Sequence, residues 1–190
     1  MRENNRRVTN PQAITLRPMT EARELAPGEW SVLALLCEQP AHGWALAQAL
    51  APDGEIGSVW TLGRPVVYRA LQTLAEHGLV EPAGQEPGTR GPSRTIFAPT
   101  AAGRAAVRRW LAQPAGHVRD IRSLLVLKLV FAERAGVDSA PMLAKQRAAL
   151  EPLVASLEQQ LAESSGSRRI LLRYRLETAR AALRFVDASA

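Results

Sequence analysis

Prolines and glycines divide residues 26–113 into short segments, and this punctuation constrains the fold more than any other feature of the sequence. Pro27 and Pro65 can each occupy the first turn of a helix, where a missing N–H has no cost. His77–Gly78 is a typical C-terminal stop, because glycine readily adopts the left-handed conformation that ends many helices. We therefore expect this part of the chain to form a small domain of short helices with tight connections.

Apolar residues recur at helical spacing in three of these segments, over residues 27–39, 44–51 and 65–77. The three apolar stripes are, in chain order, Trp30, Leu33, Ala34 and Cys37, then Trp44, Leu46, Ala47 and Leu50, then Val67, Ala70, Leu71 and Leu74. Because tryptophan buries a large apolar surface, we expect Trp30 and Trp44 to be anchors of the core or of an interface.

A β-hairpin is predicted after the third helix. Residues 79–81 form a short strand, residues 83–92 are rich in glycine and proline, and residues 93–98 are β-prone. Thr100 then caps a fourth helix over residues 101–111. Three helices, a hairpin and a further helix are the element order of a winged helix-turn-helix, in which the hairpin is the wing.

The remainder of the chain is predicted to be helical after a linker at residues 114–116. We expect helices over 118–135, 141–163 and 168–186, with Pro152 kinking or breaking the second of them. The last helix has a heptad-like apolar seam, which fits packing within one chain and packing between two chains equally well. The residues expected to support a dimer are Leu125, Leu129, Leu172, Leu176, Leu183 and Val186.

Together these elements predict a mainly α fold with a small β-hairpin wing. The 190 residues are enough for two small domains. We expect a basic, mostly disordered arm over 1–25, a winged helix-turn-helix domain over 26–113 and a helical dimerisation domain over 117–190.

The charge of the chain points to a polyanionic partner. Its net charge is +6 and its pI about 10.6. No Asp or Glu occurs from Pro87 to Arg119, although solvated surfaces usually mix both signs. The arginines of this stretch are Arg90, Arg94, Arg104, Arg108, Arg109 and Arg119.

A winged helix-turn-helix with such charge is suited to duplex DNA. The third helix fits the major groove, where an arginine can bind guanine through two hydrogen bonds. Its exposed residues near the N-terminus are Arg64, Tyr68 and Arg69. Arginines on a glycine-rich hairpin suit phosphate or minor-groove contacts. The wing residues expected to contact DNA are Thr89, Arg90, Ser93 and Arg94.

Other classes of function have little support in the sequence. The three histidines and the single cysteine, Cys37, show no metal-ligand spacing and no nucleophile motif, so we expect neither an enzyme nor a cofactor or metal. No apolar run approaches the roughly 20 residues that span a bilayer, and no signal peptide is evident. We therefore expect a cytoplasmic protein without membrane contact.

Residues 25–112 resemble the PadR family of bacterial regulators. The resemblance lies in the His42–Gly43 pair, in the run from Tyr68 to Leu79, and in the wing that leads into the sequence TAAGR. It implies a homodimeric repressor that binds DNA through the third helix and the wing. It also implies release by a small aromatic or drug-like effector, which would bind at the dimer interface near Trp110.

Two other interpretations remain open at this point. A MarR-like regulator has a similar domain, but its dimer is usually built from helices at both ends of the chain. A winged helix can also bind protein, although that role does not require an arginine-rich hairpin. We expect a homodimer that presents two winged domains to a pseudo-palindromic DNA site.

Overall fold

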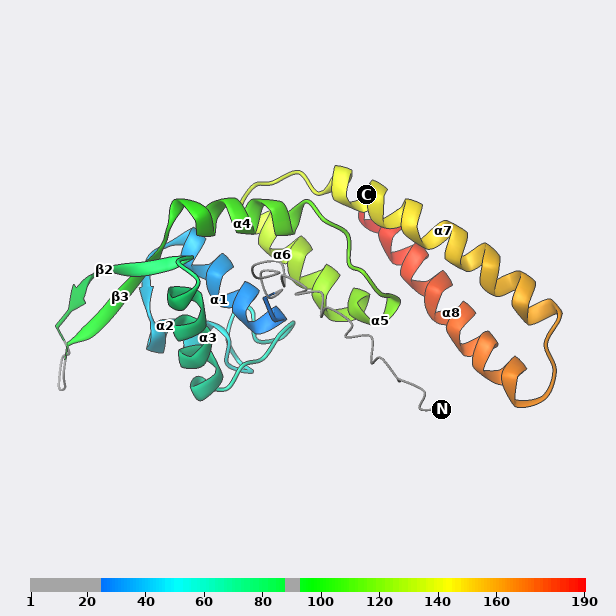
Figure 1. Cartoon of the computed structure of the whole chain (residues 1–190), viewed down its shortest axis with the longest axis horizontal. Coiled ribbons are helices and arrows are strands. Elements are labelled where there is room, and N and C mark those ends of the chain that lie inside the picture. Colours follow the sequence, from blue (N-terminus) through cyan, green and yellow to red (C-terminus); the bar gives the residue numbers. More distant parts are fainter. Residues whose placement is uncertain (1–24, 88–92) are drawn as a thin grey trace, which may run out of the picture.

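The computed structural model describes residues 25–87 and 93–190 of this chain. Figure 1 shows helices gathered around a small sheet, and a pair of long helices that extends away from them. The fold is therefore mainly α with a small β-hairpin wing, as predicted. Within the two described ranges, no helix has the length and apolar character needed to cross a membrane.

The elements have the following bounds. The helices are α1 (Pro27–Glu38), α2 (Gly43–Ala49), α3 (Arg64–Glu76), α4 (Ala101–Leu111), α5 (Val118–Asp120), the π-helical turn η1 (Ile121–Leu125), α6 (Val126–Arg134), α7 (Ala140–Ala162) and α8 (Gly166–Ser189). The strands are β1 (Ala41–His42), β2 (Val80–Glu86) and β3 (Arg94–Pro99).

The helix ends follow the punctuation of the sequence. The Glu29 carboxylate accepts a hydrogen bond of 2.7 Å from the N–H of Ala26 and thereby caps α1. At the start of α4, the Thr100 hydroxyl accepts from the N–H of Gly103 at 3.1 Å and donates to the carbonyl of Gly78 at 2.8 Å. Gly78 has a φ of 66°, the left-handed conformation that ends α3. The caps predicted at Thr100 and Gly78 are confirmed.

The sheet contains three antiparallel strands in the order β1-β3-β2. The strand predicted at 79–81 was too short, and β1 was not predicted at all. Six of the seven residues of β2 are exposed, so the strand is stabilised by its hydrogen-bonded pairing with β3. For the same reason its sequence has no alternation of apolar and polar residues from which the strand could be predicted. The register shifts between Pro82 and Gly84, at residues that weaken a regular ladder.

Helix α1 lies at the centre of the winged domain. Val32 and Leu33 have no exposed surface, and the helix contacts α3, α4 and β3. Full burial of such a side chain stabilises the fold by about 1.5–3 kcal/mol. Leu127 and Phe131 of α6 belong to the same core. The domain division predicted at residues 114–116 stays a prediction, and α6 shares a core with the elements that precede it.

The segment predicted as one helix over 118–135 consists of α5, η1 and α6. Ile121 and Leu125 pack with residues of α7 and α8 in a second cluster, whereas Leu127 and Phe131 face the winged core. A π-helical turn adds one residue to a helix and so rotates the faces that follow it. This rotation lets one short segment contribute to two cores.

Helices α7 and α8 pack along each other (Figure 1). Their shared cluster contains Leu157, Leu172, Leu176 and Ala179. Helix α7 continues through Pro152, so the predicted break is wrong. Pro152 is exposed, and the helix carbonyl that lacks its usual donor can therefore face water while packing against α8 holds the helix together.

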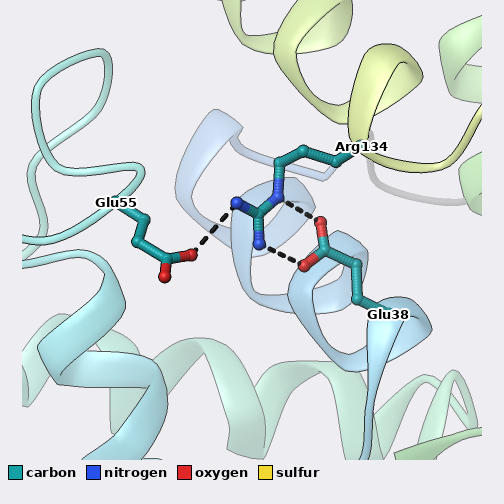
Figure 2. Close-up of polar contacts among 3 residues, drawn as sticks. All are labelled: Glu38, Glu55 and Arg134. Carbon is teal, nitrogen blue, oxygen red and sulfur yellow. Dashed lines mark hydrogen bonds and ion pairs between the residues drawn. The ribbon is translucent and has the colours of Figure 1, made fainter.

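Arg134, the last residue of α6, connects that helix to the winged domain (Figure 2). Its Nε and Nη2 donate to the two carboxylate oxygens of Glu38 at 2.7 and 2.6 Å, and its Nη1 donates to Glu55 at 3.0 Å. The hydrogen bonds to Glu38 raise the pKa of the guanidinium above its ordinary value. Because Glu38 ends α1 and Glu55 precedes α3, Arg134 joins three parts of the domain.

We expect Arg134→Ala to lower the free energy of unfolding by about 1–2 kcal/mol, since it removes a bidentate pair that is only partly exposed. Arg134→Lys keeps the charge but not the two parallel hydrogen bonds, and should recover less than half of the loss. Urea denaturation measures both effects. The matched control is Arg184→Ala, an exposed arginine on α8. Equal unfolding midpoints for the Arg134 and Arg184 variants would show that the connection contributes nothing.

Candidate nucleic-acid interface

Helix α3 has one buried face and one exposed face. Val67, Ala70, Leu71 and Leu74 are buried in the core, as the apolar stripe predicted. The three residues predicted to contact DNA, Arg64, Tyr68 and Arg69, are all exposed. Pro65 occupies the first turn, and the N–H of Leu62 donates to the carbonyl of Leu50 at 2.9 Å. That bond places the start of α3 beside the end of α2.

Tyr68 packs against the start of α2. A β-carbon on Gly43 would lie 2.8 Å from Cε1 of the Tyr68 ring and 3.2 Å from Leu71, so only glycine leaves room for the ring. Tyr68 remains 45% exposed in this position. The His42–Gly43 pair therefore connects the two helices of the helix-turn-helix, and the Tyr68 ring has a fixed support on the outer surface.

The base of the wing carries a pair of large side chains. The Arg94 guanidinium lies 5.2 Å from the centroid of the Trp44 ring, a distance at which a cation is attracted to the ring face. Trp44 is 41% exposed, so it is not a core anchor, and the other expected role, as an anchor of an interface, stays a prediction. Ser93 is exposed, and Thr89 and Arg90 lie outside the described residues. The exposed position of Trp44 was not predicted, because its spacing from Leu46 and Ala47 is that of a buried apolar stripe.

The arginines of α4 face other parts of the molecule. Arg104 and Arg108 are close enough to Cys37 of α1 to lower the pKa of its thiol, but burial outweighs them and the pKa is raised overall. Arg109 lines a cavity beside Trp110. The arginines of the acid-free stretch therefore do not form one surface. The exposed cations and aromatic rings gather instead on α3 and at the base of the wing.

A cavity of about 700 Å³ lies between the winged domain and the segment from η1 to α6. Trp30 and Trp110 form one wall, with ring centroids 5.1 Å apart and planes inclined by 8°. Lys128 is 3% exposed; its Nζ donates to the carbonyl of Gln113 at 2.7 Å and lies 5.3 Å from the Trp110 ring. The indole nitrogen of Trp60, also on the cavity wall, is buried and has no hydrogen-bond acceptor among the described residues.

This cavity has an aromatic wall and a buried cation, Lys128, beside that wall. An aromatic ring that carries a hydrogen-bond acceptor would match both. Trp110, the residue predicted to contact an effector, lies in this wall and is itself part of the winged core.

The residues predicted to support a dimer pack within the chain. Leu172, Leu176 and Val186 are buried between α7 and α8 or against η1, and Leu125 is fully buried beside them. Leu129 and Leu183 are half-buried against the same cluster. The seam of the last helix therefore contacts α7 of the same chain, and whether a partner touches the half-buried members stays a prediction.

Other apolar residues of the helical pair are open to solvent. Ile170 is 74% exposed, Tyr174 70% and Leu171 49%, all on α8. Leu153 of α7, 38% exposed, lines a groove of about 550 Å³ with Tyr174. These residues lie outside the heptad spacing of α8, so the apolar periodicity of the sequence does not mark them.

No group of His, Cys, Asp and Glu suited to a metal ion is found within residues 25–87 and 93–190.

Comparison with known proteins finds similarity in the N-terminal half of the described chain. Residues 32–109 match the model of the transcriptional regulator PadR-like family. A 92-residue stretch is 32% identical to the probable transcriptional regulator Rv1176c of Mycobacterium tuberculosis. The alignment covers 48% of this chain and 47% of that relative, about half the length of each. Residues 32–109 of this chain are therefore similar to the PadR-like family of transcriptional regulators.

The comparison with solved structures finds matches at low sequence identity. Bacillus subtilis PadR in complex with operator DNA is 14% identical with a TM-score of 0.44, over 84% of this chain and 95% of that one. The same protein in complex with p-coumaric acid gives 15% and 0.41, over 86% and 96%. The Vibrio cholerae virulence activator AphA gives 22% and 0.40, over 85% and 95%. Since these TM-scores are below 0.5, the similarity to the PadR-like family rests on the sequence match over residues 32–109.

Proposed function

We propose that this chain is a DNA-binding transcriptional repressor that acts as a homodimer on a pseudo-palindromic site and is released by a small-molecule effector. The observation that carries the proposal is the exposed face of α3, where Arg64, Tyr68 and Arg69 stand free of the core in a PadR-like domain. The base of the wing, with Arg94 and Trp44, adds a second contact region.

The two regions suit different parts of DNA. Arg64 and Arg69 near the start of α3 can bind base edges in the major groove, which gives sequence preference. Arg94 is held by Trp44 and suits a phosphate, which gives affinity without preference. A dimer doubles both sets of contacts and sets the spacing of the two half-sites.

Fluorescence anisotropy with duplex DNA from upstream of the gene that encodes this chain tests DNA binding. Scrambled duplex at several salt concentrations is the comparison. Arg64→Ala and Arg69→Ala should each reduce affinity by about 1–3 kcal/mol and lower the preference for the native duplex. Arg94→Ala should weaken binding to both duplexes and reduce the salt slope by about 0.9 for one lost phosphate contact.

The control for these variants is Arg184→Ala, which removes the same charge from α8. If it weakens binding as much as the α3 variants do, the effect is general charge and α3 has no special role. If the wild type binds neither duplex even at low salt, the DNA-binding proposal falls. The alternative of a protein-binding winged helix then gains support.

The dimer proposal rests on the exposed apolar residues of α8. A second copy of this chain would cover Ile170, Leu171 and Tyr174, together with the groove beside Leu153. Isolated exposed apolar residues are common, but several on one helix mark an interaction surface.

Tyr174→Asp combined with Ile170→Asp should yield a folded monomer, because charges would then have to be buried at the interface. Sedimentation equilibrium should give twice the chain mass of 20.6 kDa for the wild type and the single mass for the variant. Gln159→Asp, an exposed position on α7, is the control and should stay dimeric. A monomeric wild type at micromolar concentration would contradict the two-domain model.

The effector proposal rests on the cavity with the Trp30–Trp110 stack. A ligand there would contact both the winged core and the segment from η1 to α6, and would therefore change how the two parts are connected. Lys128, which lies over the Trp110 ring, favours a ligand that carries hydrogen-bond acceptors.

p-Coumaric acid is the first probe. We expect it to quench tryptophan fluorescence and to lower the affinity for DNA. Lys128→Met keeps the packing of a buried chain and should reduce ligand affinity about tenfold through loss of the charge. Arg184→Met, which removes an exposed charge on α8 remote from the cavity, is the matched control. If neither p-coumaric acid nor a panel of aromatic acids changes fluorescence or DNA binding, the cavity is not an effector site for that class.

A further inference from the structure

His42 lies where the wing, the first strand and the helix-turn-helix meet. It is 8% exposed, ends β1 and precedes α2. Its Nδ1 accepts a hydrogen bond of 3.0 Å from the N–H of Ala45, so the side chain caps α2. A ring nitrogen that accepts this bond carries no proton, and the neutral imidazole therefore has its proton on Nε2.

The other ring nitrogen faces both strands of the wing. Nε2 lies 3.3 Å from Oε2 of Glu86 and 3.4 Å from Nη1 of Arg94. Because Nε2 carries the proton, the Glu86 carboxylate is its partner. The Arg94 guanidinium can only donate hydrogen bonds, so it cannot accept one from Nε2–H. It is attracted to the face of the Trp44 ring instead.

These contacts act at the outer end of the described wing. Glu86 is the last residue of β2 and Arg94 is the first residue of β3, and the two are paired in the register of the sheet. Beyond Val80 every residue of β2 is exposed, so the outer wing has little apolar core of its own. A two-stranded ribbon without such a core is only marginally ordered in water.

We infer that His42 is a positioning residue, which fixes the direction of the wing relative to α3. The connection runs from Glu86 through the His42 ring to the start of α2, and from Gly43 to the Tyr68 ring on α3. The wing and α3 then form one preformed surface for DNA, which avoids the entropic cost of ordering the wing on binding. The DNA part of this inference rests on the proposed function.

Two substitutions separate the capping role of His42 from its contact with the wing. His42→Asn places an oxygen where it can cap α2 but is too short to reach Glu86. His42→Gln has an amide long enough to reach Glu86 but is a poor helix cap. A purely structural role predicts that Asn restores both stability and DNA binding. A positioning role predicts that Asn restores stability alone.

Hydrogen exchange of wing peptides, thermal unfolding and DNA anisotropy are measured on the full chain. For His42→Asn we expect an unfolding temperature close to that of the wild type, about tenfold faster exchange in residues 80–86 and 94–99, and about tenfold weaker DNA binding. His42→Gln should unfold several degrees lower but keep wing protection and DNA affinity closer to the wild type.

Glu86→Ala, which removes the acceptor of the Nε2–H bond, provides an independent check through exchange alone, because it also removes a negative charge near the DNA. It should speed exchange of the wing as His42→Asn does, and the double variant should be no faster than either single one. Unchanged wing exchange in His42→Asn would overturn the inference and leave His42 as a helix cap. If the wild type binds no duplex while the exchange pattern appears as expected, the wing contact holds and the proposed function fails.

Discussion

The burial of helix α1 is the constraint on which the winged domain depends. Most of its side chains from Ser31 to Leu36 are inaccessible to water, so α3, α4, β3 and α6 all pack against it. The position of the exposed face of α3 follows from this packing, since Val67 and Leu74 must point toward α1. The candidate interface is therefore the outer face of helices whose inner faces share one core.

The segment from α5 to α6 gives the molecule its second organising feature. Its first part packs with α7 and α8, its second part packs in the winged core, and Arg134 fastens its end to α1. A cavity lies against the π-helical turn between the two parts. A change at that turn would alter the relation between the helical pair and the winged domain without unfolding either core.

Much of the candidate site could be predicted from local rules. Arg64, Tyr68 and Arg69 were located because they fall outside an apolar stripe of helical period, and that stripe is buried. Trp44 could not be placed in this way, because α2 is short and its spacing fits either face. The role of His42 was hidden for another reason, since Glu86 and Arg94 reach it only after the strands have paired.

Local sequence patterns predicted the four main helices of the winged domain, the caps at Thr100 and Gly78 and the buried face of α3, because each depends on residues a few positions apart. Only the tertiary structure shows which element packs against each apolar face. The seam of Leu172 and Leu176 fitted two arrangements, and the packing of α7 assigned it to the same chain and left Ile170 and Tyr174 exposed. Tertiary packing also explains why α7 remains continuous through Pro152 and why α6 packs in the winged core. These outcomes depend on contacts between distant segments, which local periodicity does not encode.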